Sequence, residues 1–152
     1  MSRRSWIILA TLGSIALLGG AFVFQALGYA PCKLCLWQRW PHAAAIVIGV
    51  VAVATRMRFW PWLGALAAAV TSGLGVYHTG VEKAWWVGPT TCTSGPVSGM
   101  SAGDLLAQIN AAPLIRCDEV AWALMGVSMA SWNAILSAVL VVVWVKAALT
   151  RP

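Results

Sequence analysis

The chain has 152 residues, of which 61% are hydrophobic and 9% charged, and its formal net charge is +6. That length suits one domain, and the composition excludes an ordinary soluble domain, in which about a quarter of the residues are charged. The basic residues stand at the ends of apolar segments rather than in a stripe, which excludes a nucleic-acid-binding protein. The sequence therefore predicts an integral membrane protein whose basic residues set its orientation.

Four apolar segments are long enough to cross a bilayer as helices, for which about 20 residues are needed. They are residues 6–27, 35–55, 60–79 and 129–149. A cleaved signal peptide is the alternative for the first segment, although its apolar run exceeds the usual length of about 7–15 residues. In the third segment, Gly64, Ala68 and Ser72 recur every fourth residue, which predicts a face for close helix packing. We expect an all-α membrane protein, one domain built as an antiparallel four-transmembrane-helix bundle.

A short connection over residues 28–34 and a long one over residues 80–128 join these segments on one side. The long connection holds all four acidic residues and two of the four cysteines. Within it, residues 104–109 predict a short amphipathic helix lying on the membrane surface. A mobile loop held only by its cysteines is the alternative.

The basic residues flank the segments unevenly. Six share one side, Arg3, Arg4, Arg56, Arg58, Lys146 and Arg151, whereas the opposite flanks carry Lys33, Lys83 and Arg116. By the positive-inside rule, both termini are cytoplasmic. All four cysteines then face an oxidising compartment, where disulfides persist. Tryptophans near the segment ends predict two interfacial belts, one of them formed by Trp6, Trp60, Trp62 and Trp144.

The most informative stretch is Pro31-Cys32-Lys33-Leu34-Cys35, with Arg39 one helical turn beyond. Two cysteines separated by two residues can close a small disulfide ring, and such pairs often hold one thiolate at a lowered pKa. Alone the pattern is a weak indicator, because structural disulfides and zinc sites share it. A zinc site built from all four cysteines is disfavoured, because Cys92 and Cys117 lack the usual short ligand spacing.

Two cysteine pairs on one face of the membrane predict a relay, although two structural disulfides are the alternative. Thiol–disulfide exchange passes electrons from a soluble dithiol to Cys92–Cys117 and then to Cys32–Cys35. A dithiol at the membrane surface needs a lipid-soluble two-electron acceptor, and we expect a quinone. The guanidinium of Arg39 is expected to stabilise the Cys35 thiolate and the negative charge on a quinone oxygen.

With these motifs the chain resembles the family of bacterial disulfide bond formation protein B, DsbB, whose members are quinone-linked membrane oxidases. Besides the block around Cys32 and Cys35, the resemblance rests on Tyr77-His78-Thr79-Gly80-Val81-Glu82, Gly88-Pro89-Thr90-Thr91-Cys92, Arg116-Cys117-Asp118-Glu119-Val120-Ala121-Trp122 and Met129-Ala130-Ser131-Trp132-Asn133. It implies that Cys92, in an exposed Gly/Pro-rich loop, is attacked by a soluble DsbA-like partner and that Cys117 is its disulfide mate. It also implies that Cys32 exchanges with this pair and that Cys35 contacts the quinone.

The resemblance further implies that Arg39 lines the quinone site. His78 is a second candidate there, with an ordinary interfacial histidine as the alternative, and His42 is expected to be a packing or interface residue. The implied location is the bacterial inner membrane, with the cysteines facing the periplasm and ubiquinone or menaquinone as acceptor. The alternatives are the same chemistry serving a dedicated partner other than DsbA, or a non-enzymatic membrane protein stapled by disulfides.

Overall fold

The computed structural model describes residues 1–89, 92, 101–111 and 115–151. Its elements, in chain order, are α1 (Arg3–Ala26), α2 (Lys33–Thr55), α3 (Trp60–Glu82), α4 (Ala102–Ala111), β1 (Ala123–Leu124), β2 (Val127–Ser128) and α5 (Met129–Leu149). The two strands form an antiparallel hairpin in which Ala123 pairs with Ser128. Residues 90–91, 93–100 and 112–114 of the expected long connection, including Thr90 and Thr91 of its Gly88–Cys92 motif, lie outside the described residues.

Within the described part of the chain, three helices are long and apolar enough to cross a membrane: α1, α2 and α5. The chain is therefore a multi-pass membrane protein that is mostly helical. Helix α3 has 23 residues but does not join this group. It carries polar side chains such as Thr71 and His78, which are buried against the other helices. A fourth span at α3 therefore stays a prediction.

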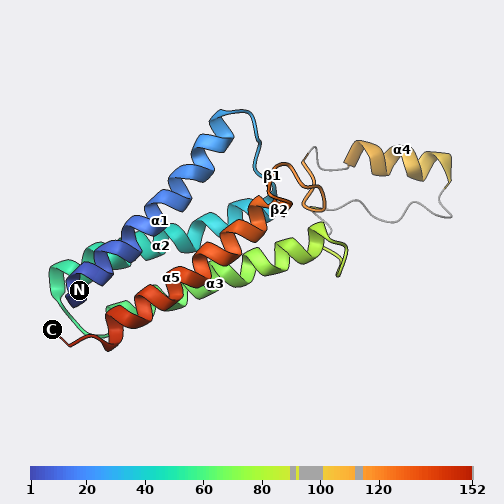
Figure 1. Cartoon of the computed structure of the whole chain (residues 1–152). Coiled ribbons are helices and arrows are strands. Elements are labelled where there is room, and N and C mark those ends of the chain that lie inside the picture. Colours follow the sequence, from blue (N-terminus) through green and yellow to red (C-terminus); the bar gives the residue numbers. More distant parts are fainter. Residues whose placement is uncertain (90–91, 93–100, 112–114, 152) are drawn as a thin grey trace.

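The four long helices lie along one another, and successive ones run in opposite directions (Figure 1). Contacts join α1 to α2, α2 to α3, α3 to α5 and α5 back to α1. Both termini lie at one end of this bundle, and the hairpin lies at the other, near the beginning of α2 and the end of α3 (Figure 1). Helix α4 lies apart from the bundle, beyond that second end (Figure 1).

The small-residue face of α3 packs closely on α5, as the sequence predicts. A Cβ added to Gly64 would lie 2.5 Å from the indole of Trp144, and one added to Gly75 would lie 2.9 Å from the backbone nitrogen of Ala134. The hydroxyl of Ser72 donates to the carbonyl of Ala134 at 2.9 Å. Glycine at these two positions therefore lets the backbones approach in a way that a larger side chain would prevent.

Trp144 does not belong to an interfacial belt, so that prediction is wrong for this residue. Its side chain is 0% exposed and forms part of a core with Ile7, Ala65 and Leu140. The hollow above Gly64 accommodates the ring, which is why a tryptophan near a helix end turns inward here.

Arg3 ties the beginning of α1 to the end of α2. Its side chain is buried and donates from Nη1 to the carbonyl of Arg56 at 3.0 Å and from Nη2 to the carbonyl of Met57 at 2.6 Å. Carbonyl groups at a helix C-terminus lack partners within the helix and carry partial negative charge, so a guanidinium there is doubly favourable.

The helix expected over residues 104–109 is present as α4. Its beginning is stabilised by Ser101, whose hydroxyl accepts from the Asp104 backbone N–H at 3.2 Å and donates to the Asp104 carboxylate at 2.6 Å. This reciprocal arrangement is typical of a helix N-terminus. Its placement on a membrane surface stays a prediction.

Candidate redox site and its cavity

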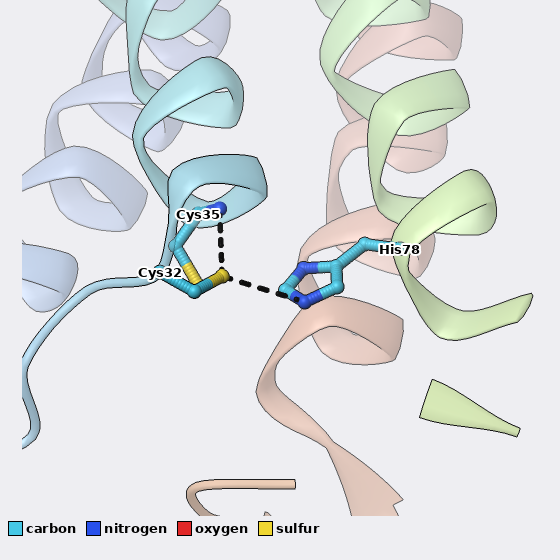
Figure 2. A group of neighbouring side chains, drawn as sticks. All are labelled: Cys32, Cys35 and His78. Atoms are coloured by element: carbon cyan, nitrogen blue, oxygen red, sulfur yellow. Dashed lines mark hydrogen bonds between the residues drawn. The ribbon is translucent and has the colours of Figure 1, made fainter. Parts of the chain in front are cut away.

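Cys32 and Cys35 lie at the N-terminus of α2, where the helix begins. Cys32 is the N-cap residue, and its sulfur accepts a hydrogen bond from the Cys35 backbone N–H at 3.2 Å (Figure 2). Both cysteines are free thiols, and the S–H of Cys32 donates to the Cys35 sulfur at 2.8 Å. The pKa of Cys32 is raised by this hydrogen bond to Cys35 and, next, by burial. Cys32 therefore holds the shared proton, and the Cys35 sulfur accepts it.

His78 approaches this pair from α3, across the bundle (Figure 2). Its Nε2 atom lies 3.6 Å from the Cys32 sulfur and 4.0 Å from the Glu82 carboxylate, one helical turn further along α3. The Cys117 backbone also faces the ring. The other carboxylate oxygen of Glu82 accepts a hydrogen bond from the Ser128 hydroxyl at the beginning of α5. Glu82 was not expected at the site, although its spacing of four residues from His78 on one helix could have indicated it.

The second cysteine pair is a disulfide between Cys92 and Cys117, with Cα atoms 5.3 Å apart. The sulfurs of Cys32, Cys92 and Cys117 all lie within 4.8 Å of one another. Cys92 and Cys117 of the long connection thus lie beside Cys32 at the beginning of α2, which brings the two cysteine pairs together.

Cys92 is 1% exposed, so the expectation of an exposed cysteine is wrong for this structure. The disulfide is buried because it packs with Cys32, Leu34 and Val81 in one apolar cluster. A Gly/Pro-rich sequence predicted a surface loop but could not reveal that its cysteine docks against α2 and α3.

A cavity of about 410 Å³ opens beside the first cysteine pair. Its walls are mostly apolar, and four of the predicted site residues line it: Cys32, Cys35, Arg39 and His78. Cys92 and Cys117 do not line it. Further polar side chains line the wall that were not expected at the site: Gln38, His42, Glu82, Arg116, Glu119 and Asn133.

Arg39 lines the cavity but its guanidinium is held by α1. Nη1 donates to the side-chain oxygen of Gln25 at 2.7 Å and Nη2 to the carbonyl of Ala21 at 3.3 Å. The charged group also lies over the ring of Phe22, 4.9 Å from its centre, which is a favourable cation–π distance. Arg39 is therefore fixed between two helices rather than extended toward lipid headgroups.

Buried amide groups connect the two histidines of the chain. Gln38 Nε2 lies 3.0 Å from His78 Nδ1. The Oε1 atom of Gln38 accepts a hydrogen bond from Asn133 Nδ2 at 2.7 Å. Asn133 Oδ1 in turn lies 3.0 Å from His42 Nε2. Residues 35, 38, 39 and 42 share one face of α2 at helical spacing, which is the sequence signal that could have placed Gln38 and His42 at the site.

Cys32, Cys35 and His78 also present atoms within 4.8 Å of one another, a spacing that a metal ion could bridge. Thiolate and imidazole are ordinary zinc ligands, so these three donors are compatible with zinc while the cysteines are reduced. A zinc site that uses all four cysteines does not fit this structure, because the sulfurs of Cys92 and Cys117 are bonded to each other.

Comparisons with known proteins identify the family of the chain. Residues 3–147 match the family described as disulfide bond formation protein DsbB. Similar curated proteins are the disulfide bond formation protein B of Verminephrobacter eiseniae, 28% identical over 90% of this chain and 81% of the relative, and disulfide bond formation protein B 2 of Pseudomonas aeruginosa, 30% identical over 87% and 82%. A third, from a Shewanella species, is 33% identical over 86% and 78%. No solved structure matches significantly. The chain belongs to the DsbB family of membrane proteins, which is named for disulfide bond formation.

Proposed function

We propose that the chain is a membrane thiol–disulfide oxidoreductase that reoxidises a periplasmic DsbA-like dithiol protein. It passes the electrons through two cysteine pairs to a membrane quinone, either ubiquinone or menaquinone. The observation that carries the proposal is the cluster of Cys32, Cys92 and Cys117, whose sulfurs lie within 4.8 Å of one another. A free thiol beside a disulfide is the arrangement that thiol–disulfide exchange requires.

The first exchange involves the soluble partner. A thiolate of the partner attacks Cys92, forming a mixed disulfide, and Cys117 leaves as a thiolate. The second thiolate of the partner then attacks its own sulfur in that mixed disulfide and releases Cys92. The partner has lost two electrons and two protons, and the Cys92–Cys117 pair has gained them. Because both cysteines are buried, the disulfide must separate from Leu34 and Val81 before the partner reaches it.

The second exchange occurs between the two pairs of this chain. A thiolate of the outer pair, Cys92 and Cys117, attacks Cys32 of an oxidised Cys32–Cys35 pair, and Cys35 leaves as a thiolate. The other outer thiolate closes Cys92–Cys117 again and releases Cys32. Free thiols at Cys32 and Cys35 beside a closed outer disulfide correspond to the end of this step. The imidazole of His78, 3.6 Å from the Cys32 sulfur, would stabilise the negative charge on that leaving group.

The cavity beside Cys35 suits a quinone ring. Its volume of about 410 Å³ lies within the range of about 300–1,000 Å³ for ligand sites, and its wall is mostly apolar with a few polar groups. Two lining residues each have a buried nitrogen with no hydrogen-bond partner among the described residues, Nε of Arg39 and Nδ1 of His42. Cys35, Arg39 and His78 are the residues proposed to hold the ring. When bound, the quinone supplies the acceptor for the two electrons and two protons that the Cys32 and Cys35 thiols release.

Quinone reduction by the purified full chain tests the proposal, with a reduced DsbA protein as donor and the quinone absorbance as readout. We expect Cys35→Ser and Cys92→Ser each to abolish turnover. Activity with dithiothreitol but none with DsbA would instead indicate a dedicated partner. A chain whose cysteines are purely structural would reduce quinone with neither donor, and that result would refute the proposal.

We further infer that α3 is a fourth span, that the membrane is the bacterial inner membrane and that both termini are cytoplasmic. The arginine distribution and the position of both termini at one bundle end support this (Figure 1). In a chain without native cysteines, Met125→Cys in the exposed hairpin should react with an impermeant thiol reagent in spheroplasts, and Ser2→Cys should react only after permeabilisation. The reverse pattern would invert the orientation.

A further inference from the structure

His42 has no role in the reaction as proposed so far. It is 3% exposed and lies on α2 two turns beyond Cys35, in the wall of the same cavity. Its Nε2 atom lies 3.0 Å from Asn133 Oδ1, whereas its Nδ1 atom has no hydrogen-bond partner among the described residues. A buried ring nitrogen in a cavity wall is costly to leave unpaired, which suggests that a ligand completes it.

The orientation of the Gln38 amide follows from its surroundings. Gln38 Nε2 lies 3.1 Å from the backbone carbonyl of Leu34. A carbonyl oxygen can only accept a hydrogen bond, so the Gln38 atom that faces it is the NH₂ nitrogen. The same NH₂ group faces His78 Nδ1 at 3.0 Å, so that ring nitrogen is the acceptor. A neutral imidazole then carries its proton on Nε2, which points toward the Cys32 sulfur.

The orientation of the Asn133 amide follows in the same way. Its Nδ2 atom lies 3.4 Å from the backbone carbonyl of Thr71 and 3.2 Å from the Thr71 hydroxyl oxygen. That hydroxyl donates its own hydrogen to the carbonyl of Gln38 at 3.0 Å, so it can only accept from Asn133. Oδ1 is therefore the atom that faces His42, and His42 Nε2 must be the donor. Nδ1 of His42, a residue of the cavity wall, is left with a lone pair that has no hydrogen-bond partner among the described residues.

These assignments give one hydrogen-bonded chain with a single direction. His42 donates to Asn133, Asn133 to Gln38, Gln38 to His78, His78 to Cys32, and Cys32 to Cys35. Figure 2 shows its last members, the imidazole and the two sulfurs. Its two ends, the Nδ1 atom of His42 and the sulfur of Cys35, both lie in residues that line the cavity. Hydrogen bonds in such a chain polarise one another, so the group bound at one end influences the other.

We propose that His42 Nδ1 accepts a hydrogen bond from a hydroxyl of the reduced, hydroquinone form of the ring. The proposal rests on the function proposed above and adds a polar contact in the cavity wall, seven positions along α2 from Cys35. An oxidised quinone offers only acceptor oxygens and cannot pair with this lone pair, whereas a hydroquinone offers O–H donors. Cys35 and His42 are seven positions apart on α2, about 10 Å along the helix axis, and both line the cavity. The site therefore binds the reduced ring more tightly at this end than the oxidised one.

Nitrogen-15 NMR tests the tautomer in the intact chain, which contains only two histidines. A full chain carrying Cys32→Ser and Cys35→Ser cannot exchange electrons with the ring, so both redox forms of decylubiquinone can be added at equilibrium. We expect His42 Nδ1 to have the shift of an unprotonated nitrogen and to move toward the hydrogen-bonded value with decylubiquinol but not with decylubiquinone. A proton on Nδ1, or equal responses to both forms, would overturn the proposal.

Binding to His42→Phe in the same background supplies the second test, because phenylalanine keeps an aromatic ring but has no lone pair that can accept the hydroxyl. We expect the Kd for decylubiquinol to rise about 3- to 10-fold, the worth of one neutral hydrogen bond, and the Kd for decylubiquinone to change less than about 2-fold. Ser137→Ala is the matched control, since Ser137 bonds the same pair from outside the cavity, and both Kd values should be unchanged. Equal weakening of both forms would reduce His42 to a packing role. Failure of the parent to bind either form would refute the quinone site itself.

Discussion

The Nε2 atom of His78 lies 3.6 Å from the sulfur of Cys32, which joins two residues 46 positions apart across the contact between α2 and α3. The Cys32 thiol has a raised pKa, chiefly because it donates to Cys35 and also because it is buried. An imidazole N–H beside the sulfur acts in the opposite direction, since it favours the thiolate. His78 is thus placed to help the Cys32 sulfur, whose thiol pKa is raised, leave with a negative charge.

We expect His78→Phe to slow electron transfer from the Cys92/Cys117 dithiol to Cys32–Cys35 by about 10- to 100-fold, the worth of one hydrogen bond to a charged group. The rate is measured without quinone, by acid quench and labelling of free thiols. His78→Gln can still donate an N–H to the sulfur and is expected to retain most of the rate. Equal losses in the two variants would mean that the ring only fills space.

The close approach of α3 and α5 at Gly75 predicts a large difference between two neighbouring glycines. A Cβ at Gly75 would lie 2.9 Å from the Ala134 nitrogen and 3.0 Å from the Ala130 carbonyl oxygen, whereas a Cβ at Gly73 would meet nothing within 4 Å. We expect Gly75→Ala to lower the free energy of unfolding by about 1–3 kcal/mol through overpacking. Gly73→Ala should be neutral or stabilising by up to about 1 kcal/mol, because alanine favours helix. Circular dichroism during detergent-induced unfolding measures both, and equal effects would argue against the close contact.

The parts of the molecule that follow from local pattern could be predicted from the sequence. Apolar runs indicated the long helices, and small residues at spacing four indicated the face of α3 that packs on α5. One closely spaced cysteine pair, Cys32 and Cys35, and one widely spaced pair, Cys92 and Cys117, indicated an electron relay. That inference needs only residue types and the expected membrane topology. What could not be predicted depends on contacts between distant segments. Neither the burial of Cys92 against Leu34 nor the burial of Trp144 above Gly64 has a local signal.

The polar network shows the same limit. Gln38 and Asn133 are 95 positions apart and look unremarkable singly, yet their amides bond at 2.7 Å and connect two histidines. His42 was expected to be a packing or interface residue because nothing in its sequence neighbours indicates that it lines a cavity with one ring nitrogen unpaired. Membrane interiors penalise unpaired polar groups, so a histidine and a glutamine on the face of α2 that carries Cys35 could have suggested a shared site.

Asp118, next to Cys117, predicts a pH dependence for the stability of the outer disulfide. Arg116 donates to its two carboxylate oxygens at 2.9 and 2.6 Å, and this hydrogen bonding lowers the pKa of Asp118 below its ordinary value of 3.8. Because the folded-state pKa is lowered, the ion pair contributes stability above pH 3.8 and that contribution is lost as the pH falls through the lowered value. Both side chains are partly exposed, so the effect is modest.

We therefore expect Asp118→Asn to speed reduction of the Cys92–Cys117 disulfide by less than about 5-fold at neutral pH. A phosphine reductant that works in acid measures the rate in a chain carrying Cys32→Ser and Cys35→Ser. The parent and Asp118→Asn rates should converge below pH 3.8. Glu119→Gln is the control, because Glu119 is more exposed and lies 3.5 Å from Arg116, and it should have a smaller effect. A constant ratio of rates at every pH would contradict the ion-pair explanation.

Cys117→Ser is expected to trap a mixed disulfide between Cys92 and the soluble partner, because the resolving thiol is missing. Burial of the pair adds a prediction about rate. Val81→Ala weakens the apolar cluster that holds the disulfide and should speed formation of the adduct, since the cysteine becomes accessible more often. Non-reducing electrophoresis with a DsbA protein measures both. An adduct that forms in Cys92→Ser and never in Cys117→Ser would reverse the two roles.

Arg39 supplies the sharpest test of the quinone site. Its guanidinium is fixed by Gln25 and by the carbonyl of Ala21, while its Nε atom is buried without a partner in the cavity wall. Lysine has one charged nitrogen and cannot reproduce this fork, so it can reach either α1 or a ligand oxygen, but not both.

We expect Arg39→Lys to raise the apparent KM for quinone by about 10- to 100-fold, the worth of one charge-assisted hydrogen bond, and Arg39→Ala to raise it at least as much. Gln25→Leu removes only the anchor on α1 and should change KM by less than about 5-fold, because a neutral partner is lost while the charge remains. Single-turnover oxidation of the soluble partner without quinone should be unchanged in all three variants, since that exchange takes place at Cys92–Cys117. If Gln25→Leu raises KM as much as Arg39→Lys does, then Arg39 acts by holding α1 against α2, and its contact with the quinone is refuted.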